Sequence, residues 1–297
     1  MREEIDEKKK VEEYRKKIRH NYNPQFYDNA NKIIKFLRMP KWFFGNIIVE
    51  GVENVNEVKD KQLIYMSNHV SLADFLVQGH VFWKYALPIP RILAGENLNR
   101  FLVGRFFKKC GAIFIDRNSK DKSYWRVEDE EIKNILSNKE NLLIYPEGTR
   151  NDKLSEKLKT GSLGQLVDFV DEAKDLYIVP IWINYDKRVE ERFINKVREN
   201  KEKRDNLKKK AKNFRENGKN FRAKITNFRA IIKDNTYFTL DLTAYIIRPF
   251  SKEKGNAYLN FGKAFSLKNS LENIDKQKKF ILADIIRGEL EKLGSRN

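Results

Sequence analysis

Cysteine is almost absent from this chain of 297 residues, in which Cys110 is the only one. One cysteine excludes an intrachain disulfide and every zinc or redox motif that pairs cysteines. Cys110 lies among apolar residues, so we interpret it as a small core residue rather than a nucleophile. The cysteine content therefore indicates a reducing compartment.

Long apolar runs are also missing, because none approaches the roughly 18 to 20 residues of a membrane-spanning helix. The opening residues, MREEIDEKKKVEEYRKK, lack the apolar centre that a secretory signal needs. These two absences lead us to expect a soluble or peripheral protein.

Acidic residues are too few to balance the basic ones, since 60 Lys plus Arg face 42 Asp plus Glu and leave a net charge of +18. Residues 187–233, which we call the basic insert, hold 18 of the basic residues and six of the acidic ones. The basic insert is interpreted either as a solvated helix or mobile insert, or as a platform for anionic lipid head groups. An acidic carrier protein could use it too. We expect no nucleic-acid partner, because no recognised binding motif accompanies the charge.

The N-terminal segment, residues 1–45, is predicted to be helical. Residues 1 to about 20 form a charged amphipathic helix or a frayed end. Residues 22–45 interleave aromatic side chains with Lys and Arg, which suits a helix lying in a membrane interface. The same apolar stripe could instead pack on the rest of the protein.

Apolar runs with turn residues at their ends predict strands, and apolar residues at helical spacing predict helices between them. Residues 91–117 predict a strand, a turn, an amphipathic helix and a strand. Pro180 lies inside a predicted strand and indicates a sheet edge or a bulge. The other predicted strands are 47–50, 63–66, 142–145, 178–183, 237–247 and 257–261, and the other predicted helices are 72–82, 124–137, 163–170 and 280–293.

His69 and Asp74 lie in the stretch NHVSLAD, between a predicted strand and a predicted helix. Five residues on a uniform helix would place the two side chains roughly 140° apart. They meet only if His69 precedes the helix and Asp74 lies in its first turns. Asp74 would then bind one ring nitrogen and leave the other free to take a proton. Taken alone, the spacing also suits a surface histidine beside an Asp at a helix N-terminus.

Polar residues follow two later strands. Arg117 comes after residues 112–115, and the turn from Glu147 to Arg150 comes after residues 142–145. Strand ends commonly carry ligand-contacting residues in α/β sheets, and an arginine can clamp a phosphate or a carboxylate. Gly148 permits a tight turn, and the charged residues around it could orient each other or a bound anion. Taken alone, these features also suit a surface arginine and a charged turn.

Four stretches in this order, NHVSLAD, GAIFIDR, YPEGTR and IVPIWI, resemble the four ordered blocks of the glycerolipid acyltransferase family. The resemblance spans roughly residues 51–267. It implies an α/β fold with a mixed, largely parallel sheet flanked by helices, and the four blocks meeting at one end of the strands. The stretches LAGENLN, KTGSLG and AYLNFGKAF resemble the branch that acylates glycerol 3-phosphate or dihydroxyacetone phosphate. YPEGTR occurs in lysophosphatidate acyltransferases as well, and the chain is short beside the large glycerol-3-phosphate enzymes.

The resemblance implies roles for named residues. His69 would be the general base and Asp74 its partner, while Pro180 would shape the acyl side of the pocket. Asn68 and Thr149 belong to the matched motifs without a physical role that we can assign to either. The residues expected to bind or position a phosphate-bearing acceptor are Arg117, Glu147, Gly148 and Arg150, with Thr149 in the same motif.

We expect His69 to remove a proton from an acceptor hydroxyl, which attacks the thioester of an acyl carrier protein or coenzyme A. Backbone amides near the motif are expected to stabilise the oxyanion. We expect no metal, no other cofactor and no covalent enzyme intermediate. The expected acceptor is glycerol 3-phosphate or a related glycerol phosphate, with lysophosphatidate as the alternative. Rival functions are a lipid hydrolase and a non-catalytic binder of anionic membranes.

These expectations give a domain plan and a location. The plan is an N-terminal helical segment at residues 1–45, an acyltransferase domain at residues 46–267 that contains the basic insert, and a C-terminal helix at residues 268–297. We expect a cytoplasmic protein that works peripherally at the inner, anionic face of the cell membrane.

Overall fold

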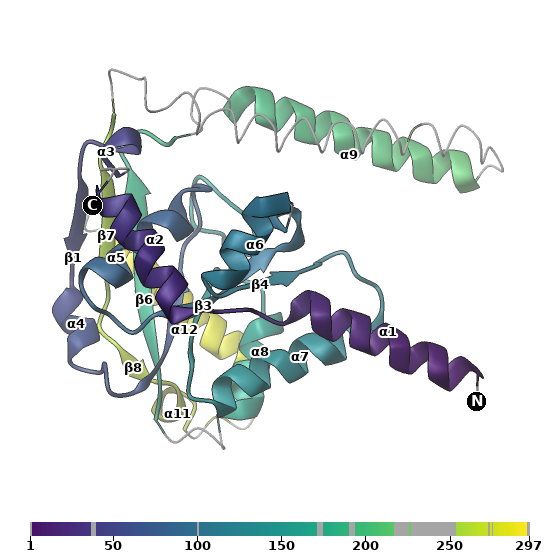
Figure 1. Cartoon of the computed structure of the whole chain (residues 1–297), viewed down its shortest axis with the longest axis horizontal. Helices are drawn as coiled ribbons and strands as arrows, with labels where there is room; N and C mark the ends of the chain where they lie inside the picture. Colours follow the sequence, from purple (N-terminus) through teal and green to yellow (C-terminus); the bar gives the residue numbers. More distant parts are fainter. Residues whose placement is uncertain are drawn as a thin grey trace.

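A computed structural model of the whole chain shows a sheet covered by helices (Figure 1). The structure describes residues 2–36, 40–99, 101–170, 175–189, 194–216, 226, 254–272, 274 and 276–295. The predicted strand at residues 237–247 lies outside the described residues, as does the later part of the basic insert.

In the described part of the chain, eight strands form one sheet in the order β1-β7-β6-β2-β5-β3-β4, with β8 paired to β6. Parallel pairing joins β2 to β5 and β6, β3 to β4 and β5, and β1 to β7, while β6 runs antiparallel to β7 and β8. The mixed, largely parallel α/β sheet that we expected is therefore confirmed. The strands are β1 (Ile47–Glu50), β2 (Gln62–Ser67), β3 (Pro90–Gly95), β4 (Ala112–Ile115), β5 (Asn141–Ile144), β6 (Leu176–Tyr185), β7 (Ala257–Phe261) and β8 (Phe265–Ser266).

Helices cover both faces of the sheet, and the two sides of β2 show why. Successive side chains of a strand point to opposite faces. Leu63 and Tyr65 therefore pack into one apolar cluster with α5, while Ile64 and Met66 pack into the other with α7, α8 and α12. The helices are α1 (Arg2–Ile18), α2 (Pro24–Phe36), α3 (Pro40–Phe43), α4 (Val52–Asn56), α5 (Asp74–Lys84), η1 (Glu96–Leu98), α6 (Phe101–Lys109), α7 (Lys122–Ser137), α8 (Gly161–Phe169), α9 (Ile194–Glu216), α11 (Leu267–Ser270) and α12 (Lys278–Gly294).

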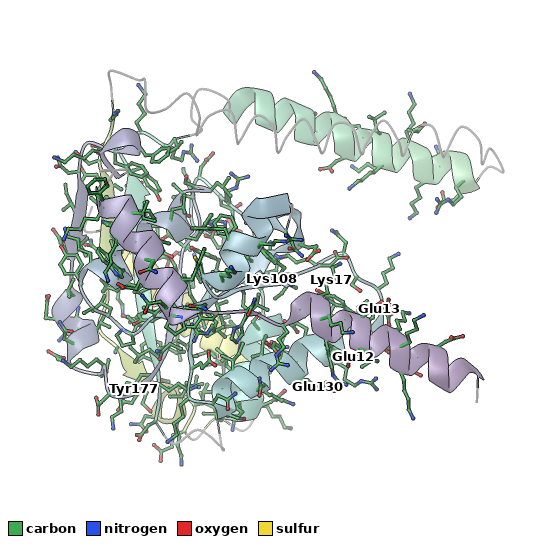
Figure 2. All side chains as sticks on the ribbon, in the orientation of Figure 1. Glu12, Glu13, Lys17, Lys108, Glu130 and Tyr177 are labelled. Atoms are coloured by element: carbon green, nitrogen blue, oxygen red, sulfur yellow. The ribbon has the colours of Figure 1, made fainter. Side chains whose placement is uncertain are left out.

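The first helix is packed against the protein rather than frayed. Ile18 of α1 is buried in the core, and the Tyr14 hydroxyl donates a hydrogen bond of 2.8 Å to Asp121 at the start of α7. At the end of α1, the Lys108 ammonium of α6 donates to the Lys17 carbonyl at 2.7 Å, and both residues are labelled in Figure 2. These contacts hold α1 beside α7 and α6.

Pro180 does not lie at a sheet edge, because its strand β6 is interior to the sheet. The expected irregularity is present in the neighbouring segment. Between the pairs Ile178↔Phe265 and Ile181↔Phe261, β6 contributes two residues and the facing segment contributes three, 262–264. The Pro180 carbonyl still accepts a bond of 2.8 Å from the Gly262 amide. A residue without an N–H is tolerated here because the regular ladder is already interrupted on that side.

Within the described part of the basic insert, α9 is a helix with exposed cationic side chains. It extends away from the sheet in Figure 1. No helix among the described residues is both long enough and apolar enough to cross a membrane.

Candidate active site

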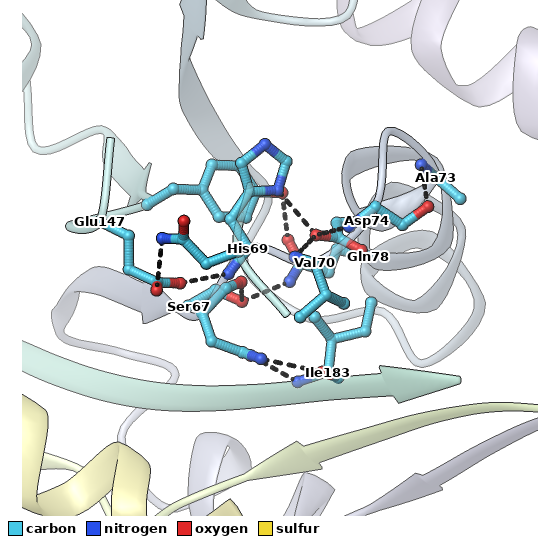
Figure 3. A network of polar contacts seen from close by, with 12 residues as sticks. Ser67, His69, Val70, Ala73, Asp74, Gln78, Glu147 and Ile183 are labelled. Carbon is cyan, nitrogen blue, oxygen red and sulfur yellow. Dashed lines mark hydrogen bonds and ion pairs between the residues drawn. The ribbon is translucent and has the colours of Figure 1, made fainter. Parts of the chain in front are cut away.

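His69 and Asp74 come together in the way that their spacing requires. His69 lies in the turn after β2, and Asp74 is the first residue of α5. The His69 Nδ1 atom lies 2.7 Å from Asp74 Oδ2. Figure 3 shows the second ring nitrogen pointing away from this network. Because a carboxylate accepts hydrogen bonds, Nδ1 carries the proton and Nε2 is the basic nitrogen.

The Asp74 carboxylate is fully buried and is fixed by several donors. Its Oδ2 atom accepts bonds from the Val70 amide at 2.8 Å and the Ser71 amide at 3.0 Å, besides the imidazole. Its Oδ1 atom accepts a bond of 2.8 Å from the Tyr185 hydroxyl at the end of β6. A buried charge needs such partners, and they hold the acid that orients the His69 ring.

Tyr145, which follows β5, fixes the other side of the His69 ring. The two rings are stacked with their centroids 4.3 Å apart and an interplanar angle of 26°. The Tyr145 hydroxyl donates to Gln78 at 2.8 Å, and Gln78 donates to Ser67 at 2.7 Å. Burial, and then the nearby Asp74 carboxylate, raise the pKa of Tyr145 well above its ordinary value. Tyr145 is therefore a neutral positioning residue.

Glu147 joins the turn after β5 to the turn after β2. Its buried carboxylate accepts the His69 amide at 2.9 Å through Oε2. Its Oε1 atom accepts the Ser155 amide at 2.9 Å and the Asn151 side chain at 3.0 Å. The His69 carbonyl in turn accepts a bond of 2.8 Å from the Asn151 amide. Protein donors thus occupy both oxygens of Glu147, which supports a positioning role rather than direct contact with an acceptor.

Gly148 and Asn68 both stabilise the turns around the site. Gly148 has a φ of +68°, a left-handed conformation that L side chains rarely adopt, and this turn needs it. The Asn68 side chain exchanges two hydrogen bonds with the Ile183 backbone, accepting at 2.7 Å and donating at 2.9 Å. Asn68 therefore ties the His69 turn to β6 just beyond the regular pairing of β2 with β6.

Three consecutive amides of the motif, those of residues 69–71, already donate to carboxylates. The His69 amide donates to Glu147, and the amides of Val70 and Ser71 donate to Asp74. The amides of residues 69–71 are therefore not the oxyanion donors, and the expectation of a backbone amide near the motif stays a prediction.

A largely apolar pocket opens beside the His69 ring, between α5, α6, β3 and α2. It encloses about 880 Å³ of space, part of it open to solvent. Ile34 of α2, Phe75 of α5 and Phe107 of α6 contribute to its wall, and Tyr145 and Arg117 line it together with His69. Among the described lining residues, Arg117 carries the one permanent charge. The pocket can hold an alkyl chain that ends at the basic nitrogen.

The remaining predicted residues lie around this pocket or away from it. Arg117 follows β4, and His69 follows β2, so both lie at the carboxyl ends of parallel strands. The two residues line the same pocket. Thr149 and Arg150 belong to the turn after β5 and are not among the described residues that line the pocket. Pro180 is also absent from that lining, so its predicted role on the acyl side is not supported.

Cys110 also lines the pocket, but its thiol is not reactive. Burial raises its pKa to about 12, so the thiolate that a nucleophile needs is scarce. The interpretation of Cys110 as a packing residue agrees with this environment.

Tyr145, Tyr185 and Gln78 were not predicted as site residues. Gln78 lies four residues after Asp74 and hence on the same face of α5, which is a signal that the sequence contains. Tyr145 and Tyr185 each end an apolar strand, where polar tips meet the site. Their partners lie 67 and 111 residues away in the chain, so only the fold identifies them.

Residues 46–184 match the family model described as acyltransferase. Among curated proteins, the chain is 32% identical over 160 residues to the human dihydroxyacetone phosphate acyltransferase, covering 51% of this chain and 24% of that protein. It is 27% identical over 192 residues to the glycerol-3-phosphate acyltransferase of Pseudomonas aeruginosa (strain UCBPP-PA14), covering 61% of this chain and 23% of that protein. The chain thus spans about a quarter of the length of these relatives.

A solved structure is also similar to the chain. It is the crystal structure of a 1-acyl-sn-glycerophosphate (LPA) acyltransferase from Thermotoga maritima, with 16% sequence identity and a TM-score of 0.43. The similarity covers 99% of this chain and 84% of that one.

Proposed function

Because residues 46–184 make this chain a member of the acyltransferase family, we propose that it transfers an acyl group from a thioester to a hydroxyl of a glycerol phosphate. The observation that carries the proposal is the His69–Asp74 pair, at 2.7 Å, facing a largely apolar pocket that also holds Arg117. A base, an apolar chain site and a cation are the three elements that such a reaction needs.

The basic Nε2 atom of His69 removes the proton of the acceptor hydroxyl. The resulting oxygen nucleophile attacks the thioester carbonyl and forms a tetrahedral intermediate. When the carbon–sulfur bond breaks, the leaving thiolate takes the proton back from His69, so the base is restored. Asp74 keeps Nδ1 protonated throughout and stabilises the imidazolium between the two steps.

The apolar pocket is suited to the acyl chain of the donor. Burying a methylene group contributes about 0.8 kcal/mol, so a long chain binds tightly in such a pocket. Ile34 of α2 lies over the chain site, and the Tyr27 hydroxyl on the same helix donates to the Gly79 carbonyl of α5 at 2.6 Å. This contact holds α2 in place as one wall.

Arg117 is the proposed partner of the acceptor phosphate. A guanidinium offers paired donors to phosphate oxygens, and Arg117 is in the same pocket as the base. The relatives named as acyltransferases of dihydroxyacetone phosphate and glycerol 3-phosphate support an acceptor of this class. We place Arg150 in a supporting role, because it is absent from the described lining of the pocket.

The donor that we propose is an acyl carrier protein or acyl-coenzyme A, and the reaction as written draws on no further cofactor. We also propose that the protein works at an anionic membrane surface on the cytoplasmic side. The exposed cations of α9 support this location, because basic residues near a membrane surface attract anionic head groups.

The test is a product assay with a donor labelled in the acyl chain, supplied as acyl-coenzyme A or acyl carrier protein. Glycerol 3-phosphate, dihydroxyacetone phosphate and lysophosphatidate are offered in parallel, with one arm that lacks an acceptor. We expect one of the first two acceptors to receive the label. Transfer to lysophosphatidate alone would replace the acceptor class by the alternative, and free fatty acid in every arm would indicate a hydrolase.

A further inference from the structure

A second pocket lies between α3, the start of β1 and the later part of α5. It encloses about 570 Å³ of space, part of it open to solvent. His80 of this pocket lies six residues after Asp74 in α5. The two residues are therefore about 9 Å apart along the helix axis. The lining residues are Lys41, Phe44, Gly45, Asn46, Ile47, Val49, His80, Val81 and Lys84.

The charges in this second pocket are all of one sign. Lys41 and Lys84 line it, and no acidic residue is among its described lining. Neither lysine forms an ion pair with a described residue. The Lys84 ammonium lies 5.0 Å from the ring centroid of Tyr85, and the Lys41 carbonyl accepts a hydrogen bond of 2.9 Å from the Lys254 ammonium. Two cations without an anion mark a place where a bound anion would be stabilised.

His80 lies in the wall between the second pocket and the apolar pocket, since it lines both. Its Nδ1 atom is buried and has no hydrogen-bond partner among the described residues. Burial lowers the pKa of His80, and so do Lys84 and Lys35. A buried nitrogen without a partner is uncommon in a folded protein. An anion placed between the lysines and this ring would give the nitrogen a hydrogen-bond partner and would offset the charge of the lysines.

Apolar side chains are exposed near the end of α2, whose Lys35 also acts electrostatically on His80. Phe36 is 85% exposed and Ile33 is 57% exposed, both near the end of α2. The Lys35 ammonium lies 5.9 Å from the ring centroid of Trp83, three residues after His80, so this end of α2 reaches the same part of α5. Exposed apolar side chains flanked by lysines are the arrangement of a surface that enters a membrane interface.

We propose that the pocket of Lys41, His80 and Lys84 binds the phosphate of an anionic phospholipid, so that this face docks on the membrane with Phe36 inserted beside the head group. A free phosphate ion shares the chemistry of the head group, but it gives no reason for large apolar side chains exposed next to the cations. The proposal does not rest on the reaction at His69, because it concerns a separate pocket.

The test uses the full chain and vesicles of phosphatidylcholine with or without phosphatidylglycerol, measured by co-sedimentation without an acyl donor. We expect binding to require phosphatidylglycerol and to weaken about tenfold or more in the variant K41E/K84E. The matched control is K59E/K268E, which makes the same change in net charge at two exposed lysines outside the pocket. We expect the control to weaken binding no more than about threefold.

Equal weakening by both variants would overturn the proposal, because attraction would then depend on net charge alone. Phe36→Ser is the second variant, since an exposed side chain can be changed without disturbing the core. We expect it to weaken vesicle binding and to leave binding of soluble inorganic phosphate unchanged. The lipid assignment would be overturned if the native chain bound inorganic phosphate but no vesicles, and if K41E/K84E abolished that phosphate binding. His69→Ala should bind vesicles as the native chain does, which separates this proposal from the proposed catalysis.

Discussion

Two histidines that lie eleven residues apart in the chain have different surroundings. The His69 ring is bonded to Asp74 and stacked on Tyr145, while the His80 ring has a buried Nδ1 atom without a partner among the described residues. A ring held on two sides is ready to exchange a proton without reorganising. A ring that lacks a partner and lies near unpaired lysines is a place for a ligand. The difference agrees with the proposed chemistry at one site and the proposed binding at the other.

The two rings are surrounded by residues of opposite charge. Buried carboxylates organise the His69 turn, since Asp74 and Glu147 accept donors from three separate segments. The described lining of the His80 pocket contains lysines and no acid. The first site is complete without a ligand, and the second lacks its counter-charge.

The largest effect is expected when His69, rather than another histidine, is replaced. His69→Ala should lower the turnover number by about 10²- to 10⁴-fold, because it removes the proposed general base. The matched control is His20→Ala, which changes a histidine that lies near Glu140, away from the catalytic pair. Initial rates of labelled product should fall only in the first variant. Comparable losses in two folded variants would contradict the assignment of the base.

The second effect tests the phosphate partner. Arg117→Ala should raise the KM for a phosphorylated acceptor by about 10- to 100-fold, since a charge-assisted hydrogen bond contributes about 1.5 to 3 kcal/mol. Arg150→Ala should raise it less, because Arg150 is not among the described residues lining the pocket. Steady-state kinetics at saturating donor measure both. A larger change for Arg150→Ala would move the phosphate to the turn after β5.

The third effect probes the support of the catalytic acid. Tyr185→Phe removes one bond of 2.8 Å to Asp74 and should cost about 1 kcal/mol in the free energy of unfolding. Tyr177→Phe, on the same strand, is the matched control, because no hydrogen bond joins its hydroxyl to a described residue. Urea unfolding of the two variants measures the difference. Equal stabilities would show that the Tyr185 bond does not stabilise the network.

The smallest expected effect concerns pH and His80. Its pKa is lowered in the folded chain, so the unfolded chain binds the proton more readily. Stability should therefore fall as the pH drops below the ordinary histidine pKa of about 6.5. His80→Gln should reduce this fall, as measured by the urea midpoint at about pH 7.5 and about pH 5.5. Burial also lowers the pKa of His20. Both proteins contain His20, so its contribution to the pH dependence cancels in the comparison. An unchanged pH dependence would contradict the lowered pKa.

Local pattern predicted much of the fold and the central pair. The strand at residues 63–66 and the helix that follows it are found as β2 and α5, because apolar periodicity reports the buried face of each. The same pattern required His69 to precede the helix, and it does. For Pro180 the sequence left a sheet edge and a bulge open, and a single strand could not decide between them, because the extra residue lies in the segment that faces it.

The site was harder to predict where its contacts join distant segments. Glu147 follows a strand end like a ligand-binding residue, yet its carboxylate is occupied by donors from two turns. The sequence shows a charged residue but not whether protein donors already satisfy it. The second pocket was missed for the same reason, since Lys41 and Lys84 lie on elements that meet only in the fold.

The most direct test of the proposed catalysis is the fate of a labelled acyl thioester with and without a glycerol phosphate acceptor. We predict that the native chain moves the label to the acceptor, that little label is released without one, and that His69→Ala does neither. Release of free fatty acid at the same rate in both arms, or transfer by His69→Ala at the native rate, would contradict acyl transfer by the His69–Asp74 pair.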